Sequence, residues 1–423
     1  MNDHTTALVP LETSVFTSPA LANRGRRVDI GLLAEALIYY ESILLNVSSE
    51  PQFAALVEWF VDRGLFDTFL YLLREKAIRV YHYAFFGGPL LLQNGTYHLV
   101  NFQDEEQAKG DTFHRALSHQ TLRTVVPDSR RRDALAAALQ GRVVEVKSSR
   151  FGPAVDGARH DFGDRVRHEL ALQALLDELY PLAQLGPAPI VYVEVTTSGE
   201  ATRATYNLNL EQLRAAIPRL GWHGGTLQAA LMVANKHTLA ASYNDCDLFM
   251  ASPLAQLVGD KLAETGTHRT GTQDTLRELV AEVDFPDVRF LVNGGRLSFQ
   301  DVMRLRNGAS RFRNWLQGRG DRDTSALIAY HNEVAKESGL RHATRRALRL
   351  FGYGVGPAIG AWSPEPIGAT AGVVATALVT ELTRRLEEQW RPVVFGRWAA
   401  DFVRQATAAR GLSKTTPTVI SPR

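Results

Sequence analysis

The feature that most constrains the fold is the alternation, over the first 210 residues, of short β-branched or aromatic runs with amphipathic helical segments. The runs SILLNV, IRVYHYAFF and PIVYVEVTT are typical of strands. Helical periodicity lies between them, as in PQFAALVEWFVDRGLFDTFLYLLREKA, which Gly64 divides into two helices. From residue 211 onward helical periodicity dominates. We therefore predict an α+β protein, with a mixed α/β N-terminal half followed by a mostly helical C-terminal half.

Length and composition bound the number of domains. A chain of 423 residues usually forms two or three domains, and 45% hydrophobic residues are enough for a sizeable core. We expect five segments: a flexible leader (1–27), a mixed α/β domain (28–210), a helical domain with basic helices (211–350), a Gly-rich apolar hairpin with terminal helices (351–411) and a disordered tail (412–423).

Charge and cysteine content restrict the environment and the partners. The only cysteine, Cys246, excludes an internal disulfide and fits a reducing cytoplasm. The N-terminus lacks the pattern of a secretory signal. A net charge of +2 gives no global field for nucleic acid, and 40 arginines beside 7 lysines indicate codon bias. We expect a cytoplasmic protein, either free or associated with a membrane, for which nucleic acid is a less favoured partner.

A glycine-rich apolar segment covers residues 351–382. Arg349, Glu365 and Glu381 delimit two uncharged runs of fifteen residues, each shorter than the roughly 20 residues that a spanning helix needs. The segment therefore forms either a buried helix pair or a hairpin that enters a membrane through close glycine contacts. A dinucleotide fingerprint is disfavoured, because no strand precedes the glycines and Pro357 lacks an N–H.

A basic helix precedes this segment. Residues 304–349 hold eleven basic and four acidic side chains, and three arginines recur at intervals of four. Such a helix is typical of a surface that meets anionic lipid, although a solvated helix face gives the same pattern. The residues that we expect to contact an anionic membrane surface or a protein partner are Arg341, Arg345, Arg349, Gly354, Gly356 and Gly360.

A short acidic pattern begins at Pro127-Asp128 and continues with Glu145-Val-Lys147. This pattern resembles the PD-(D/E)xK nuclease motif. The resemblance implies that Asp128 and Glu145 hold Mg²⁺ and that Lys147 orients or activates the attacking water. The sequence departs from that family because a helix, rather than a strand hairpin, separates Asp128 from Glu145. Asp128 also precedes this helix directly, which favours N-terminal capping.

Histidine and aspartate offer a second candidate metal site. His160, Asp164 and His168 are spaced by four residues, so they would share one face of a continuous helix. Gly163 interrupts that helix, and a solvated His–Asp pair explains the spacing equally well. The sequence holds no Walker A loop, HExxH, GxSxG or CxxC pattern.

Three functional hypotheses follow. The first is a non-enzymatic sensor or effector, of a stress or phage-defence type, that acts on a partner or membrane through its basic and Gly-rich C-terminal segments and needs no cofactor. The second is a metal-dependent nuclease that uses Mg²⁺ at Asp128, Glu145 and Lys147. The third is a soluble assembly or regulatory protein with neither role.

Overall fold

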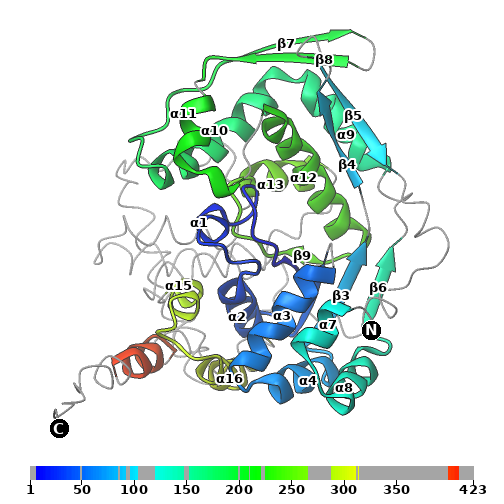
Figure 1. Ribbon diagram of the computed structural model, residues 1–423, viewed down its shortest axis with the longest axis vertical. Coiled ribbons are helices and arrows are strands. Elements are labelled where there is room, and N and C mark those ends of the chain that lie inside the picture. Colours follow the sequence, from blue (N-terminus) through cyan, green and yellow to red (C-terminus); the bar gives the residue numbers. More distant parts are fainter. Residues whose placement is uncertain are drawn as a thin grey trace, which may run out of the picture.

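The computed structural model describes residues 6–47, 50–83, 86–91, 96–102, 120–146, 152–198, 201–208, 210–220, 224–264, 287–310, 313 and 399–408. Five parallel strands form its central sheet in the order β6-β3-β2-β1-β9 (Figure 1). These strands are β1 (Thr6–Pro10), β2 (Ser42–Val47), β3 (Ile78–Tyr83), β6 (Val143–Val146) and β9 (Asp247–Leu248). The predicted mixed α/β N-terminal half is confirmed.

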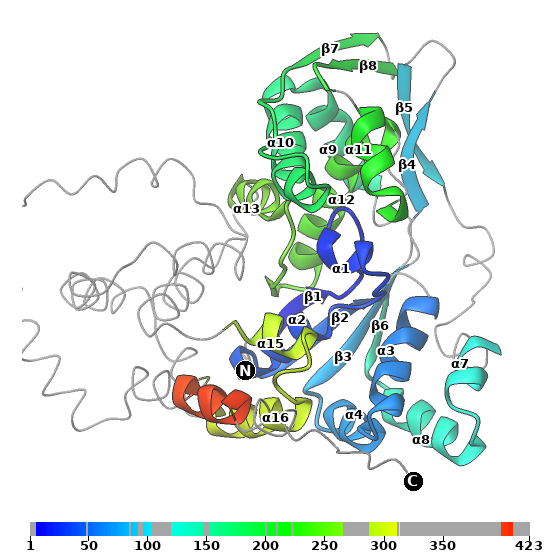
Figure 2. The same cartoon turned by 60° about the vertical axis from the view of Figure 1, so that its left-hand side comes forward.

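Two groups of helices cover the two faces of this sheet (Figure 2). The helices on one face are α2 (Ile30–Tyr39), α3 (Glu50–Asp62), α4 (Phe66–Arg74), α7 (Gln120–Val125), α8 (Ser129–Leu139), α15 (Val288–Asn293), α16 (Phe299–Gly308) and residues 399–408. The other face is covered by α9 (Gly152–Gly163), α10 (Arg165–Leu182), α11 (Leu210–Ala216), α12 (Gly224–Tyr243) and α13 (Ala255–Glu264). Among the described residues beyond 211, η2 (Pro218–Leu220) and β9 are the only regular elements other than α-helices.

Side-chain alternation along the strands explains the two cores. In β1, Ala7 and Val9 pack with the α2–α3 side, whereas Leu8 between them packs with the α10–α12 side. Successive side chains of a strand point to opposite faces, so a central parallel strand must be apolar on both. β1 pairs with β2 and β9, which places it in the interior of the sheet.

A second, antiparallel sheet lies over the α9–α10 layer (Figure 1). Its order is β4-β5-β8-β7, from β4 (Phe86–Leu91), β5 (Thr96–Phe102), β7 (Val193–Ser198) and β8 (Ala201–Tyr206). Gln173 of α10 binds the backbone of the segment before β7, because its Oε1 accepts from Val191 N at 2.9 Å. The sheet is thereby attached to the helical layer rather than to the parallel sheet.

Residues 287–313 attach to α2 through close backbone contact and buried arginines. A Cβ at Gly31 would lie 2.2 Å from Arg289 O, so α15 can approach α2 only at a glycine. Arg306 donates to the carbonyls of Leu37, Tyr40 and Glu41 at the C-terminal end of α2, where unpaired carbonyls need donors. Burial, followed by the nearby charge of Arg313, lowers the pKa of Arg306 to about 10.

The expected division into five segments stays a prediction, and two features of the structure bear on its boundaries. Residues 6–10 are not part of a flexible leader, because they form the buried strand β1. The boundary expected at 210 divides a single core, since Leu176 of α10 and Leu231 of α12 pack in the same cluster. The Gly-rich hairpin, the basic helix with Arg341, Arg345 and Arg349, and the tail lie outside the described residues. Within the part of the chain that is described, no helix is both long and apolar enough to cross a bilayer.

Candidate functional site

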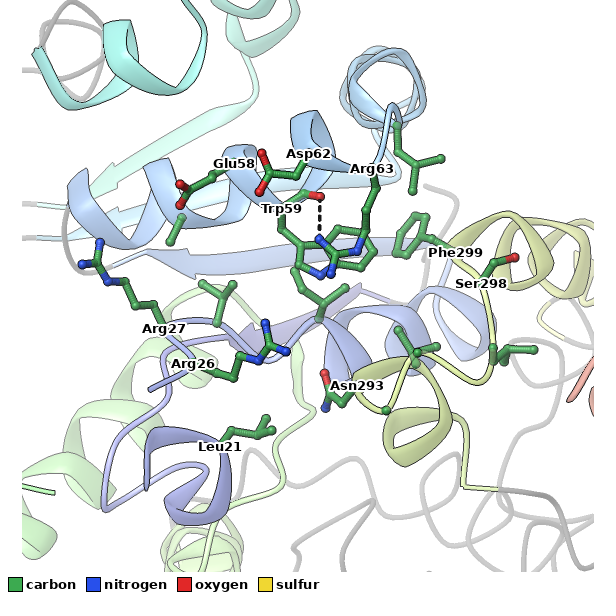
Figure 3. Close-up of a pocket in the computed structure, with 18 of the residues that line it drawn as sticks. Leu21, Arg26, Arg27, Glu58, Trp59, Asp62, Arg63, Asn293, Ser298 and Phe299 are labelled. Atoms are coloured by element: carbon green, nitrogen blue, oxygen red, sulfur yellow. Dashed lines mark hydrogen bonds between the residues drawn. The ribbon is translucent and has the colours of Figure 1, made fainter. Parts of the chain in front are cut away.

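A pocket of about 640 Å³ opens where the connection from β1 to α2 meets α3 and the α15–α16 turn (Figure 3). The strand order of the parallel sheet changes direction at β1, since β2, β3 and β6 follow on one side and β9 lies on the other. Connections that leave the carboxyl ends of strands near such a point commonly bind ligands. The volume lies in the range of small-molecule sites.

Three helix ends of the same type surround the pocket. α1 (Pro19–Asn23) ends with bonds from Gly25 N to Ala22 O and from Arg26 N to Leu21 O. This pair of bonds is the Schellman motif, which needs a residue of positive φ, and Gly25 has φ +72°. Equivalent bond pairs end α3 at Gly64 and α15 at Gly295.

The first of these helix ends positions two adjacent arginines. Thr13 binds the turn that follows Gly25, because its N–H donates to Arg27 O and its hydroxyl donates to Arg26 O. An antiparallel bridge between Glu12 and Val28 completes the anchor. The backbone at Arg26 and Arg27 is therefore held, while both side chains are exposed and line the pocket.

An arginine stacked on a tryptophan forms the opposite wall. The guanidinium carbon of Arg63 lies 4.4 Å from the centroid of the Trp59 ring, and Arg63 Nη1 donates to Trp59 O at 3.4 Å. The Trp59 ring packs edge-on against Phe60 and Phe299, with centroids at 5.1 and 5.6 Å. These contacts fix the ring, and the ring in turn provides a surface for the guanidinium.

The pocket carries both signs of charge. Arg26, Arg27 and Arg63 line it together with Glu58 and Asp62. Among the described residues, no salt bridge joins these arginines to an acidic side chain. Helix C-termini carry partial negative charge, which by itself favours basic side chains at these positions. A ligand that engages the three arginines must therefore supply full negative charge.

A buried carboxylate lies behind the pocket. Asp29 caps α2 by accepting from Leu32 N at 3.0 Å, and it also accepts from Arg289 at 2.7 Å and from Asn293 Nδ2 at 2.7 Å. Burial alone would raise the pKa of Asp29, but the charge of Arg289 and these hydrogen bonds outweigh it and hold the pKa below its usual value. Asn293, which lines the pocket, thus joins α15 to the start of α2.

A second buried acid lies on the next turn of α2. Burial, followed by the charge of Asp287, raises the pKa of Glu35 well above its usual value. Neither carboxyl oxygen of Glu35 has a hydrogen-bond partner among the described residues. Burial therefore disfavours the charged form of Glu35, and no hydrogen bond within the described part of the chain offsets this effect.

The structure describes only part of the nuclease-like set Asp128, Glu145 and Lys147. The side chain of Asp128 accepts from Arg130 N at 2.9 Å, which makes Asp128 the N-cap of α8. Glu145 lies in β6, where its register partner in β3 is His82. The side chain of Glu145 and the whole of Lys147 lie outside the described residues. The nuclease hypothesis stays a prediction.

The second candidate metal set is separated by a helix boundary. α9 ends at Gly163, and Asp164 caps α10 by accepting from Val166 N at 2.9 Å. His160 is exposed, whereas His168 is buried against Phe162. The single continuous helix that the spacing requires is absent here. No group of three metal-binding side chains occurs among the described residues, which include all three members of this set.

Comparison of the chain with protein-family models, curated proteins and solved structures finds no match. Sequence reasoning did not identify this pocket, although its signals are visible in hindsight. Each of the three helices ends in a glycine next to an arginine, in NRGRR, DRGLF and NGGR.

Proposed function

We propose that this protein is a non-enzymatic sensor that binds a small anionic ligand in the pocket between the β1–α2 connection, α3 and the α15–α16 turn. The observation that carries the proposal is the convergence of Arg26, Arg27 and Arg63 on one cavity without a described acidic partner. Guanidinium groups match the geometry of phosphate and carboxylate oxygens.

The pocket joins parts of the chain that are far apart in sequence. Asn293, which lines the site, donates to the buried Asp29, which is 264 residues away in the chain. A ligand held by Arg26 and Arg63 therefore lies in a cavity that the α15–α16 turn also lines. Binding to this folded arrangement alone stabilises it by about 2.7 kcal/mol at a ligand concentration of 100 Kd.

The output of the sensor is the second part of the proposal. In the sequence, residues 287–310, which include the α15–α16 turn of the pocket, come before the predicted basic helix and the Gly-rich segment. We expect ligand binding to change how those segments meet a partner or an anionic membrane, through Arg341, Arg345 and Arg349. Their charge pattern supports this role.

The test of the pocket uses thermal unfolding of the full chain with inorganic pyrophosphate as the probe. Pyrophosphate should raise the unfolding midpoint, and the double variant Arg26→Glu, Arg27→Glu should remove this shift. Arg24→Glu is the matched control, because Arg24 is exposed in the same turn but does not line the pocket. An equal shift in the double variant and the control would refute the proposed site.

A further inference from the structure

The two sides of the pocket differ in chemistry. Figure 3 shows Arg26 and Arg27 on one side and the α3 side chains Glu58, Trp59, Asp62 and Arg63 on the other. A ligand that fits both sides has an anionic end and a separate end that donates hydrogen bonds. A simple inorganic anion satisfies only the arginines.

The α3 side chains form two neighbouring rows. Trp59 and Arg63 are four residues apart, as are Glu58 and Asp62, so each pair lies one helical turn apart and the rows are adjacent. The Trp59 ring holds the Arg63 guanidinium on one of its planar faces at 4.4 Å. The opposite guanidinium face is a platform on which a flat ring can stack, as arginine planes do with nucleobases.

The row of carboxylates then meets the edge of a stacked ring. Glu58 and Asp62 accept hydrogen bonds and cannot donate them when ionised. They therefore favour a ring whose edge carries several N–H donors. Guanine offers its ring N1–H and its exocyclic amino group on one edge, whereas adenine offers only the amino group, and uracil offers a single N–H between two acceptors.

We propose that the ligand of the pocket is a guanine nucleoside phosphate, with its base stacked on Arg63 and edged by Glu58 and Asp62, and its phosphates on Arg26 and Arg27. This inference rests on the proposed anion-binding function and names its ligand class. The cavity of about 640 Å³ suits a base, a ribose and phosphates together, and exceeds what an isolated phosphate fills.

Calorimetric titration of the full chain tests the ligand class with four probes: GTP, ATP, UTP and pyrophosphate. GTP should bind most tightly. Arg63→Lys keeps the charge that attracts an anion but removes the planar face, so it should weaken GTP about tenfold and pyrophosphate less than GTP. Arg24→Lys is the matched control. Arg24 is the C-terminal cap of α1, just as Arg63 is the C-terminal cap of α3, but Arg24 does not line the pocket.

The carboxylates are tested separately. The double variant Glu58→Gln, Asp62→Asn should bring GTP affinity down to that for ATP, since an amide is a poorer acceptor than a carboxylate. Both residues are exposed, so the variant should fold.

Three results would overturn the inference in distinguishable ways. If pyrophosphate binds as tightly as GTP and is lost in Arg26→Glu, Arg27→Glu, the anion site stands and the nucleotide class fails. If ATP and GTP bind equally, the assignment of the base edge to Glu58 and Asp62 fails. If none of the four probes binds, the inference fails together with the proposed anion-binding function.

Discussion

Two fully buried aspartates, one on each side of the parallel sheet, are held in different ways. Asp161 of α9 accepts from Arg167 and from Lys261, each at 2.6 Å, and from Asn235 Nδ2 at 2.6 Å. Asp29 has one cationic partner, Arg289, and otherwise accepts from Ser18, Asn293 and Leu32 N. The carboxylate of Asp161 therefore balances the charge of two cations, and that of Asp29 balances the charge of one.

The surroundings of the two sites account for this difference. The partners of Asp161 come from α10, α12 and α13, which pack closely; a Cβ at Gly157 of α9 would lie 2.4 Å from Asn235 Oδ1. Asp29 instead lies buried behind the pocket, and its partner Asn293 lines that pocket. We infer that the Asp161 cluster fixes the helical layer, while the Asp29 cluster positions the walls of the site.

The largest expected effect comes from Asp161→Asn. Removing this charge leaves Lys261 buried without its counter-ion, which costs about 3–5 kcal/mol of unfolding free energy. Urea unfolding of the variant at neutral pH measures the loss. Asp164→Asn is a suitable control, because asparagine still caps α10 and Asp164 is partly exposed. A loss below 1 kcal/mol would mean that the cluster is not essential to the helical layer.

The next largest effect is a loss of folding stability at acid pH, which comes from His168 in the same helical layer as Asp161. Burial lowers the pKa of His168 to about 4, so the folded protein keeps this ring neutral. The unfolded chain takes up the proton near pH 6.5, hence stability is fully present above that pH and falls as the pH drops toward 4. Each pKa unit corresponds to about 1.4 kcal/mol, which gives roughly 3 kcal/mol in all.

A variant isolates the contribution of His168 to this response. His168→Phe removes the titrating group while keeping a ring against Phe162. Unfolding midpoints between pH 4 and 7 should depend less on pH in this variant than in the parent chain. His237, whose pKa burial lowers to about 3, accounts for part of the slope that remains. Identical profiles for variant and parent would contradict a buried neutral His168.

A smaller effect is expected from Asp29→Asn. Asparagine keeps the N-cap of α2 but loses the charge that Arg289 needs, at about 2 kcal/mol of unfolding free energy. Arg289 retains some exposure to water, which makes this loss smaller than at Asp161. Because Asp29 holds Asn293, which lines the pocket, the variant should also bind pyrophosphate more weakly than Asp161→Asn does. If Asp161→Asn instead bound pyrophosphate more weakly than Asp29→Asn, the affinity of the pocket would depend on the helical layer rather than on the Asp29 cluster.

The smallest effect is expected from Gly25→Ala. An alanine at φ +72° costs about 1 kcal/mol, and it shifts the turn that presents Arg26 and Arg27. Asn23→Ala in the preceding helix serves as the control. Thermal unfolding and pyrophosphate titration of both variants measure the two consequences. If Gly25→Ala left stability and affinity unchanged, the Schellman turn would not position the arginines.

Local patterns predicted much of the secondary structure. SILLNV was expected as a strand and is β2. The capping that the position of Asp128 favours is present in α8, and a capping box is formed by Ser298 and Asp301 in α16. These features depend on residues within one helical turn or one strand, so the sequence contains them completely.

β1 shows why other elements could not be found in this way. TALVP is too short to be recognised as a strand and lies among loop-like residues. It becomes a strand because β2 and β9 pair with it on both sides, and Asp247 of β9 is far away in sequence. Strand propensity depends on such neighbours more than on the local residues.

The sequence by itself determined the alternation of helices and strands, the helix caps and the glycine positions at which helices end. Only the tertiary structure decided that the ends of α1, α3 and α15 meet, and so brought Arg26, Arg63 and Asn293 to one pocket. Caps and periodicity act over a few residues. A pocket depends on the packing of segments that are remote in the chain, and a single sequence does not record which of its segments will touch.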